Sequence, residues 1–323
     1  MMKKLIGIDI GGTKISVILV SSRGRQLDWK VIPTRYGIKA KQSVRELVQV
    51  LENMLRANRV KHSDLRGIGV GVPGPVDPKR GVVPWSPNLP GWKGIKLKRI
   101  LEGHFHVPVF MDNDANAAGF GEKIFGAGRN VKDFVYITVS TGIGGGLVMD
   151  GKIHRGASFC GGELGHMTIV PDGDLCKCGK RGCLEAHASG TAIARMAVSK
   201  IKHGAKSKLL TLARGVRQVS ARTVSQAAEL GDRVAIQTLR EAGRYLGIGI
   251  ANLINILNPE MVVLGGSVIK SGSYLWKPMI RSAKKESWPV AFKACKIRKT
   301  VLGDQVGNLG AAALVLEQRS RRV

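Results

Sequence analysis

The chain is poor in acidic residues, in aromatic residues and in long apolar runs. It holds 23 Asp and Glu residues against 51 Lys and Arg residues, and only 5% of its residues are aromatic. No apolar run approaches the roughly 20 residues that span a bilayer. Asp9 interrupts the apolar run near the amino terminus, and no small-residue cleavage site follows it. We therefore expect a cytoplasmic protein without a membrane partner.

The net charge of +28 is large for a chain of 323 residues. Such an excess is typical of proteins that bind polyanions such as nucleic acid or polyphosphate. The basic residues are spread along the whole chain, however, and the densest region, 23–66, lacks a regular interleaving of aromatic residues that would stack bases. A generally basic surface is the simpler interpretation, and we expect no specific nucleic-acid partner.

Two halves of the sequence repeat one pattern. Residues 4–10 and 14–20 are strand-like runs joined by Gly11, Gly12 and Thr13, and residues 134–139 are followed by a glycine-rich tip, 141–146, and a return strand from Leu147. The first tip is neither a P-loop nor a dinucleotide fingerprint, since no Lys-Ser/Thr pair closes it and a strand follows it. Two hairpins with glycine tips are therefore expected.

In each half the hairpin is followed by a helix and a buried strand. The first half has a helix over 43–58, with Ser43 and Glu46 as a capping box, and a strand over 67–72. The second half has a helix over 233–257 and a strand over 261–264 that ends in Gly265-Gly266. A strand over 107–111 leads into a helix that runs to 122, and the last helix is expected over 307–318.

This repeat predicts an α/β fold of two duplicated domains that face each other across a cleft. We expect a small domain of residues 1–118 plus about 305–323 and a large domain of residues 119–304. Tight glycine turns present backbone N–H groups that bind anions, so two such tips at one cleft suit the phosphates of a nucleotide.

A cysteine cluster marks the second half. Cys176, Cys178 and Cys183 fall within eight residues, and His166 precedes them by ten. Three thiolates and one imidazole are a common ligand set for structural Zn²⁺. A disulfide is the weaker interpretation, because adjacent thiols in a chain without a signal peptide more often hold metal. Free thiols in a turn are the remaining alternative.

Several motifs resemble those of the ROK family (repressors, open reading frames, sugar kinases). They are DIGGTK at 9–14, NDAN at 113–116, ELGH at 163–166 and CKCGKRGCLE at 176–185, and NLPGW at 88–92 resembles the sugar loop of the glucokinase branch. The resemblance covers nearly the whole chain. It implies an actin-like, hexokinase-like (ribonuclease H-like) ATPase fold and a kinase that moves the γ-phosphoryl group of ATP to a sugar hydroxyl.

The resemblance also implies roles for individual residues. Asp114 would take the proton from the sugar 6-hydroxyl, with a helix N-cap as its alternative role, and Asp112 would be structural. The residues expected to bind the sugar are Asn88, Asn113, Asp114, Glu163, His166 and Glu185. Glu185 has an alternative role as a hydrogen-bonding partner of the zinc cluster.

On the nucleotide side, Asp9 would hold Mg²⁺, with a turn or capping role as the alternative. One phosphate group would contact Gly11, Gly12, Thr13 and Lys14, and the other would contact Thr141 and Gly142. Gly265 and Gly266 would line the nucleoside side or simply end a strand. The zinc ion would be structural, since His166, Cys176, Cys178 and Cys183 fill all four of its positions.

We therefore expect a glucokinase that uses ATP. Another sugar, such as N-acetylmannosamine, N-acetylglucosamine, mannose or fructose, is an alternative acceptor, and inorganic polyphosphate is an alternative donor. A sugar-sensing repressor is the alternative from another class; because the first strand begins by residue 4, we expect no recognition helix ahead of it. The resemblance implies a homodimer or homotetramer formed through the second domain.

Overall fold

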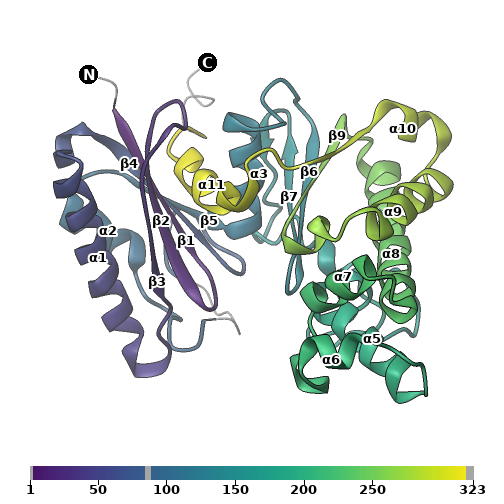
Figure 1. Ribbon diagram of the computed structural model, residues 1–323. Helices are drawn as coiled ribbons and strands as arrows, with labels where there is room; N and C mark the ends of the chain where they lie inside the picture. Colours follow the sequence, from purple (N-terminus) through teal and green to yellow (C-terminus); the bar gives the residue numbers. More distant parts are fainter. Residues whose placement is uncertain (1–2, 84–88, 318–323) are drawn as a thin grey trace. The chain divides into compact units, whose positions relative to one another are not determined.

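A computed structural model describes residues 3–83 and 89–317. The chain divides into two compact units (Figure 1). The first unit comprises residues 1–136, 146–162 and 300–323, and the second comprises residues 137–145 and 163–299. In the part of the chain that is described, no helix combines the length and the apolar character that crossing a membrane requires. The expected domain limits at 118 and 305 stay a prediction.

The first unit contains a five-stranded sheet in the order β3-β2-β1-β4-β5. The β1–β2 and β2–β3 pairs are antiparallel, whereas β1–β4 and β4–β5 are parallel. The predicted first hairpin is thus confirmed, with Ile10 paired to Ile15 next to its tip. The strands are β1 Lys4–Ile10, β2 Lys14–Ser21, β3 Gln26–Pro33, β4 Leu65–Val72 and β5 Val109–Asn113.

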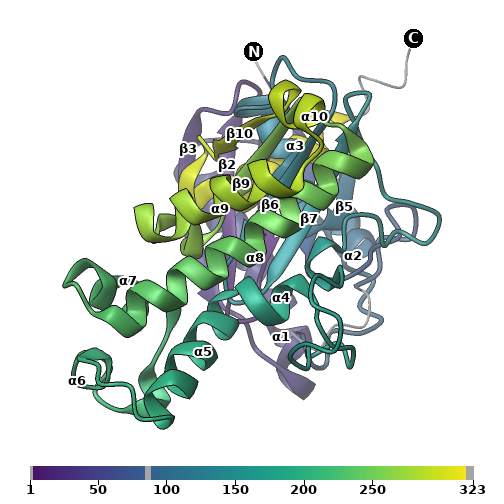
Figure 2. The same ribbon diagram turned by 90° about the vertical axis from the view of Figure 1, so that its right-hand side faces the viewer.

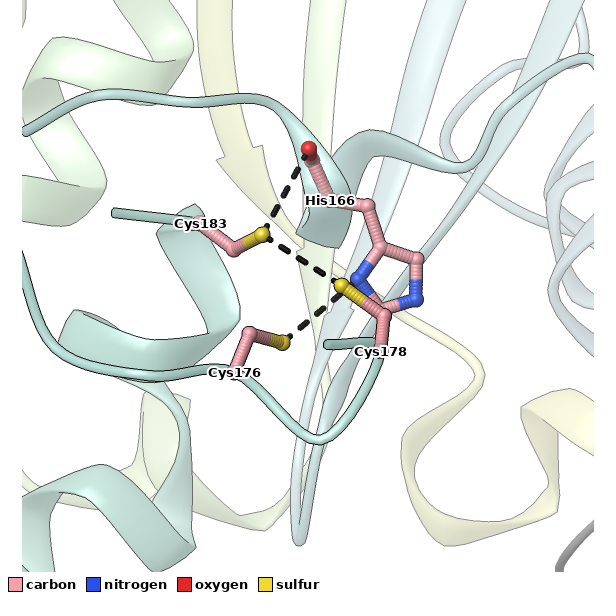
Figure 3. Close-up of side chains that lie close together, drawn as sticks. All are labelled: His166, Cys176, Cys178 and Cys183. Carbon is pink, nitrogen blue, oxygen red and sulfur yellow. Dashed lines mark hydrogen bonds between the residues drawn. The ribbon is translucent and has the colours of Figure 1, made fainter. Parts of the chain in front are cut away.

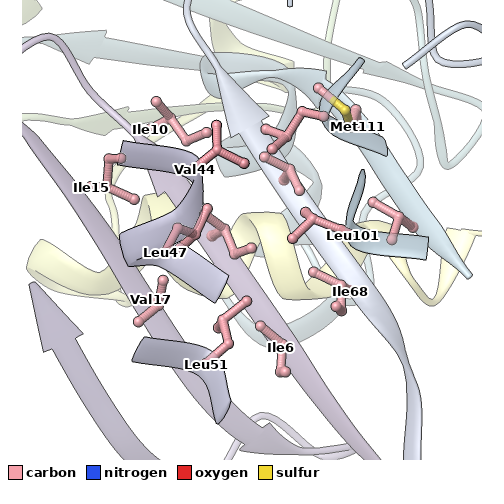
Figure 4. Close-up of a cluster of buried hydrophobic side chains, with 14 of the residues drawn as sticks. Ile6, Ile10, Ile15, Val17, Val44, Leu47, Leu51, Ile68, Leu101 and Met111 are labelled. Carbon is pink, nitrogen blue, oxygen red and sulfur yellow. The ribbon is translucent and has the colours of Figure 1, made fainter. Parts of the chain in front are cut away.

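Both faces of this sheet are covered. Ile6 and Ile8 of β1 pack with the apolar stripe of α1 (Ala40–Ala57) and with α2 (Leu97–Phe105) in the core shown in Figure 4. Leu5, on the alternate face of the same strand, packs with α11 (Val306–Leu314). Strand β1 is buried on both faces, which explains why its sequence is almost continuously apolar.

Glycines in the strands set how closely α11 approaches the sheet. A Cβ atom on Gly7 would collide with the carbonyl oxygen of Asn308, and one on Gly69 with that of Ala311. The backbone of α11 therefore lies directly on β1 and β4. Helix α3 (Asp114–Phe125) packs against α11 in the same unit through Gly121, whose Cβ position is occupied by Gly310.

A second five-stranded sheet has the order β10-β9-β6-β7-β8. Its order matches that of the first sheet. In each sheet the first strand of the hairpin (β1 or β6) lies between the second strand of the hairpin (β2 or β7) and a strand that comes later in the chain (β4 or β9). The predicted duplication is confirmed. The strands are β6 Phe134–Val139, β7 Ile143–Met149, β8 Lys152–Ile153, β9 Met261–Gly265 and β10 Lys296–Lys299, and the division between the units passes through β6 and β7.

The remaining helices belong to the second unit (Figure 2). The long helix α8 spans Arg233–Leu257 as predicted, and Asp232 caps it by accepting a hydrogen bond from the amide of Ala235. The others are α4 Leu184–Ala188, α5 Gly190–Lys202, α6 Leu209–Ala213, α7 Ala221–Glu229, α9 Ser273–Glu286 and α10 Pro289–Ala294.

Three local predictions were wrong. Helix α1 begins at Ala40, so Ser43 is no cap; its hydroxyl accepts a hydrogen bond from the amide of Arg35 instead. The second glycine tip is shorter than expected, because β7 already begins at Ile143. The last helix is α-helical only to Leu314, and residues 318–323 lie outside the described chain.

Candidate functional site

The tip of the first hairpin is held by β3. The amide of Gly11 donates to the carbonyl oxygen of Lys14 (2.9 Å), which closes the turn. Thr34, just beyond β3, donates its hydroxyl to the carbonyl oxygen of Gly11 (2.7 Å) and its amide to that of Thr13 (3.1 Å). The side chains of Thr13 and Lys14 are exposed at this tip. A braced turn with an exposed cation and hydroxyl suits an anionic group.

Asp9 lies at the base of this tip and is poorly solvated. Burial raises its pKa to about 7, the nearby Asp114 carboxylate raises it as well, and the Lys14 ammonium group opposes the rise. A Cβ atom on Gly307, in the first turn of α11, would collide with the Asp9 carboxylate, so this helix starts directly beside it. The fold thus brings Asp9 and Asp114, 105 positions apart in sequence, into one electrostatic site.

The N-cap of α3 is Asn113 and not Asp114. The side-chain oxygen of Asn113 accepts from the amides of Ala115 (2.9 Å) and Asn116 (3.2 Å), and its side-chain nitrogen donates to Gly74 (3.3 Å). Asp114 is the first residue of the helix, where one of its carboxylate oxygens accepts from the amide of Ala115 (2.8 Å). The capping role considered for Asp114 therefore falls to its neighbour.

Asp112 is engaged in a buried ion pair. One of its oxygens accepts from Arg155 (2.6 Å), and the other accepts from the side chain of Asn116 (3.0 Å) and the amide of Asn113 (2.7 Å). Burial raises the pKa of Asp112, although the Arg155 charge opposes the rise. Arg155 also binds both carboxylate oxygens of Glu317 (2.9 and 2.8 Å). No sequence motif indicates this arginine, whose partners are 43 and 162 residues away.

The predicted metal ligands of the second unit lie together (Figure 3). One donor atom each from His166, Cys176, Cys178 and Cys183 falls within 4.8 Å of every other. The Cys176 sulfur is 3.7 Å from Nδ1 of His166, and the sulfurs of Cys178 and Cys183 are also 3.7 Å apart. Zinc bonds of about 2.0–2.3 Å imply tetrahedral edges of roughly 3.5–3.8 Å, whereas a disulfide is only about 2.05 Å long. The donor set fits a structural zinc ion.

The loop geometry explains how these sulfurs meet. Gly179 and Gly182 have φ values of +90° and +76°, which only glycine adopts without strain. Burial raises the pKa of the Cys183 thiol to about 12, and the hydrogen bonds that this thiol donates to its cysteine neighbours add to the rise. A thiol so reluctant to ionise needs a cation beside it to become a thiolate ligand.

Two glutamates adjoin this cluster. A carboxylate oxygen of Glu163 lies 4.0 Å from Nε2 of His166, on the side of the ring away from Cys176. Glu185 accepts a hydrogen bond from the amide of Ile143 (2.8 Å), and its other oxygen lies 3.9 Å from the Cys176 sulfur. Glu185 therefore adjoins the metal cluster, in agreement with its alternative role, and it also binds the backbone next to the second glycine tip, a contact that was not predicted.

The second glycine tip borders a small cavity within the second unit. The amide of Gly190, which begins α5, donates to Ser140 (2.7 Å), and the hydroxyl of Thr191 donates to Thr141 (2.9 Å). The amide of Ser267, which follows Gly265 and Gly266, donates to the Ser140 hydroxyl (3.2 Å). These segments line a cavity of about 290 Å³ together with residues 219–222. Of the predicted residues, Thr141 lines the cavity, whereas Gly142, Gly265 and Gly266 only lie near its lining residues in sequence. The contributions of α5 and of residues 219–222 were not predicted.

The predicted residues thus form two groups. The first unit holds Asp9, Gly11, Gly12, Thr13, Lys14, Asn113 and Asp114. The second holds Thr141, Gly142, Glu163, His166, Glu185, Gly265 and Gly266 with the cysteines. Asn88 lies outside the described residues.

Comparison with known proteins places the chain among ROK proteins. The sequence profile of the ROK family matches residues 5–318. A glucokinase of Halalkalibacterium halodurans is 36% identical over 98% of this chain and 96% of its own length. A xylose repressor of Caldicellulosiruptor bescii is 34% identical over 97% of this chain and 78% of its own length. The structure of a ROK family glucokinase from Streptomyces griseus in complex with glucose and AMPPNP has a TM-score of 0.81 and 35% identity, and the match covers 96% of this chain and 98% of that one.

These similarities identify the fold and limit the candidate functions to those of ROK proteins. The two-sheet architecture is the actin-like ATPase fold of the ROK hexokinases. The Cys and His cluster is consistent with a ROK zinc site. Sugar kinases and sugar-responsive repressors are both among the similar proteins, so the comparisons leave these two functions to be distinguished by the chemistry of the site.

Proposed function

Because this chain belongs to the ROK family, we propose that it is an ATP-dependent hexose kinase that phosphorylates the 6-hydroxyl group of glucose. The observation that carries this proposal is the pairing of Asp9 with Asp114 at the base of the glycine hairpin. A carboxylate base and a carboxylate that favours a cation, beside a turn suited to phosphate, are the groups that phosphoryl transfer needs. A protein that only senses sugar has no need of that pair.

Asp114 is the proposed general base. Its position as first residue of α3 is fixed, because Asn113 caps the helix and Ala115 donates to the carboxylate. Asp112 is a poor candidate, since both of its oxygens are already bound by Arg155 and the Asn113–Asn116 segment. Asp114 would accept the proton of the sugar hydroxyl as that oxygen attacks the γ-phosphorus of ATP.

The nucleotide would be held by the glycine turns. Gly11, Gly12, Thr13 and Lys14 would contact one phosphate group, and Thr141 and Gly142 another. The cavity bordered by Ser267 and residues 219–222 would receive the nucleoside next to Gly265 and Gly266. Asp9 would hold Mg²⁺ through water, and the charge of the cation would oppose the rise in the Asp9 pKa that burial and Asp114 cause. When bound, Mg²⁺ offsets the charge that develops on the phosphate oxygens.

The residues proposed to bind the sugar are polar: Asn88, Asn113, Glu163, His166 and Glu185. His166 can bind zinc through Nδ1 and a sugar oxygen through Nε2, because the two nitrogens point away from each other (Figure 3). Zinc would be structural and would orient the imidazole. Glu185 would serve both the sugar and the cluster, since it already lies beside Cys176.

The proposal is tested by assaying phosphate transfer to a panel of hexoses and N-acetylhexosamines. ATP and inorganic polyphosphate are compared as donors, and binding to duplex DNA is measured with and without sugar. We expect transfer from ATP to glucose with the highest kcat/KM of the panel. Transfer from polyphosphate but not from ATP would show that polyphosphate is the donor. A higher kcat/KM for another sugar would show that this sugar, and not glucose, is the acceptor. If the protein bound a specific DNA sequence, released it when sugar was added and transferred no phosphate, it would be a repressor and not a kinase.

We also propose a homodimer or homotetramer formed through the second unit. Ile256, Trp288 and Val290 are apolar, yet 73%, 70% and 72% of their respective surfaces are exposed. The amide of Trp288 is bound to the side chain of Asn255, so these residues gather where α8 ends and α10 begins. Light scattering of the wild type and of Trp288→Ser tests this interface; an unchanged mass for the variant would place the interface elsewhere.

A further inference from the structure

A basic groove lies between α8 and α9, outside the residues assigned above. The two helices run side by side (Figure 2), and the groove encloses about 750 Å³. It is bordered by five cationic side chains and one carboxylate, that of Glu286. We call the cations the α8/α9 cation set: Arg240, Arg244, Lys277, Arg281 and Lys285.

Glycines give the groove its shape. Gly243 and Gly247 of α8 have no Cβ, and a Cβ there would collide with the carbonyl oxygens of Leu275 and Met279 in α9. The two backbones therefore touch along this seam. Side chains next to the seam rise on both sides of it, Arg240 and Arg244 from α8 and the other three cations from α9. The Ser282 hydroxyl donates to the carbonyl oxygen of Arg244 (2.9 Å) and ties the helices at this level.

The cations repel one another and are poorly compensated. All five are exposed, and Arg240, Arg244, Lys277 and Arg281 have no carboxylate within 4 Å among the described residues. Lys285 alone pairs, with Glu286 at 3.3 Å. Spacings of four residues on each helix put like charges about 6 Å apart, an arrangement that destabilises a helix. Arg244 also lies over the ring of Tyr245, with 5.5 Å between its guanidinium carbon and the ring centre. A bound anion would offset the repulsion among the five cations.

The rest of the lining suits a small organic anion. Half-buried Ile248, Tyr274 and Pro278 offer apolar and aromatic surface next to the cations. Guanidinium groups bind phosphate oxygens in pairs, and pockets of 300–1,000 Å³ hold ligands of nucleotide size. We propose that this groove binds a small molecule with two or more phosphate groups, held by Arg244 and Arg281. The proposal does not depend on the kinase activity, because it involves none of the residues assigned to that reaction.

The test uses inorganic tripolyphosphate as the probe and hydrogen exchange as the readout. Arg244→Gln combined with Arg281→Gln removes two groove charges. Arg23→Gln combined with Arg99→Gln is the matched control, because both arginines are exposed residues of the first unit and the change in net charge is the same. At 150 mM salt we expect the probe to protect peptides covering 240–248 and 273–286 in the wild type and the control. In the groove variant this protection should require at least tenfold more probe.

A second measurement guards against a purely structural effect. Without probe, the groove variant should melt at the same temperature as the control or higher, since like-charge repulsion is relieved. Equal protection of the groove peptides in all three proteins would overturn the proposal, as would protection confined to the glycine hairpins at 9–14 and 140–142. Tighter binding of a single-stranded oligonucleotide than of tripolyphosphate at the groove peptides would overturn it in favour of a nucleic-acid surface.

Discussion

The half-buried carboxyl group of Asp9 lies within the electrostatic field of the Asp114 carboxylate in the first unit. Two acidic groups in a poorly solvated site resist being ionised together. A cation beside the pair would favour the ionised form of both groups at neutral pH. This preference connects the local structure to the proposed kinase, in which Mg²⁺ accompanies the nucleotide and Asp114 accepts a proton.

The raised pKa of Asp9 predicts how stability depends on pH. The folded state holds the proton up to about pH 7, whereas the unfolded chain releases it near 3.8, so ionisation of Asp9 weakens the fold as pH rises through this window. In the absence of metal, Asp9→Asn should therefore gain stability relative to the wild type at pH 8 and gain little at pH 4. Urea unfolding at both values measures this; an equal difference at the two values would contradict the assignment.

The buried position of Arg155 predicts a large loss on its removal. Its side chain is 13% exposed and binds Asp112 and Glu317, so Arg155→Met would leave two carboxylates without a counter-charge. We expect a destabilisation of about 3–5 kcal/mol. Lys30→Met is the control, since the Lys30–Asp28 pair is 3.4 Å long and the lysine is 56% exposed; its loss should be below about 1 kcal/mol. Similar losses in both variants by urea unfolding would refute the structural role of Arg155.

The zinc cluster predicts coupled loss of metal and sugar binding. Cys178→Ser should reduce the zinc content from about one ion per chain to none and weaken glucose binding by roughly 10–100-fold, because His166 would lose its anchor. Cys160→Ser is the control, since Cys160 is exposed and lies outside the cluster. Elemental analysis and calorimetry give the two readouts. A zinc-free variant with normal glucose affinity would break the proposed link between the cluster and the substrate.

Long, periodic segments were predictable from sequence alone. Helix α8 and strand β6 have the expected limits, because a 25-residue apolar stripe and a β-branched run each admit one interpretation. The zinc ligands were also predictable, since their spacing in sequence limits how they can meet. Local motifs failed where a distant contact took over the residue: Ser43 resembles a cap, but its hydroxyl is bound to the amide of Arg35 and the helix begins one turn earlier.

Glycine was the least reliable indicator of local structure, because it occurs both in turns and in closely packed strands. Gly144 to Gly146 resembled part of a turn, yet they lie in β7, where a Cβ on Gly146 would come within 2.6 Å of the carbonyl oxygen of Ala115. Gly146 permits close packing against α3, which a single sequence does not distinguish from turn formation. The Arg155 network escaped prediction for a related reason, because its three members are far apart in the chain and none belongs to a motif.

The most direct test of the central claim is to compare Asp114→Asn with the wild type for glucose phosphorylation by ATP and for glucose binding by calorimetry. The amide keeps the size of the carboxylate but cannot accept the proton. We predict that kcat falls by several orders of magnitude while the Kd for glucose changes by no more than a few fold. Turnover close to that of the wild type would show that Asp114 is not the base and would remove the foundation of the proposed mechanism.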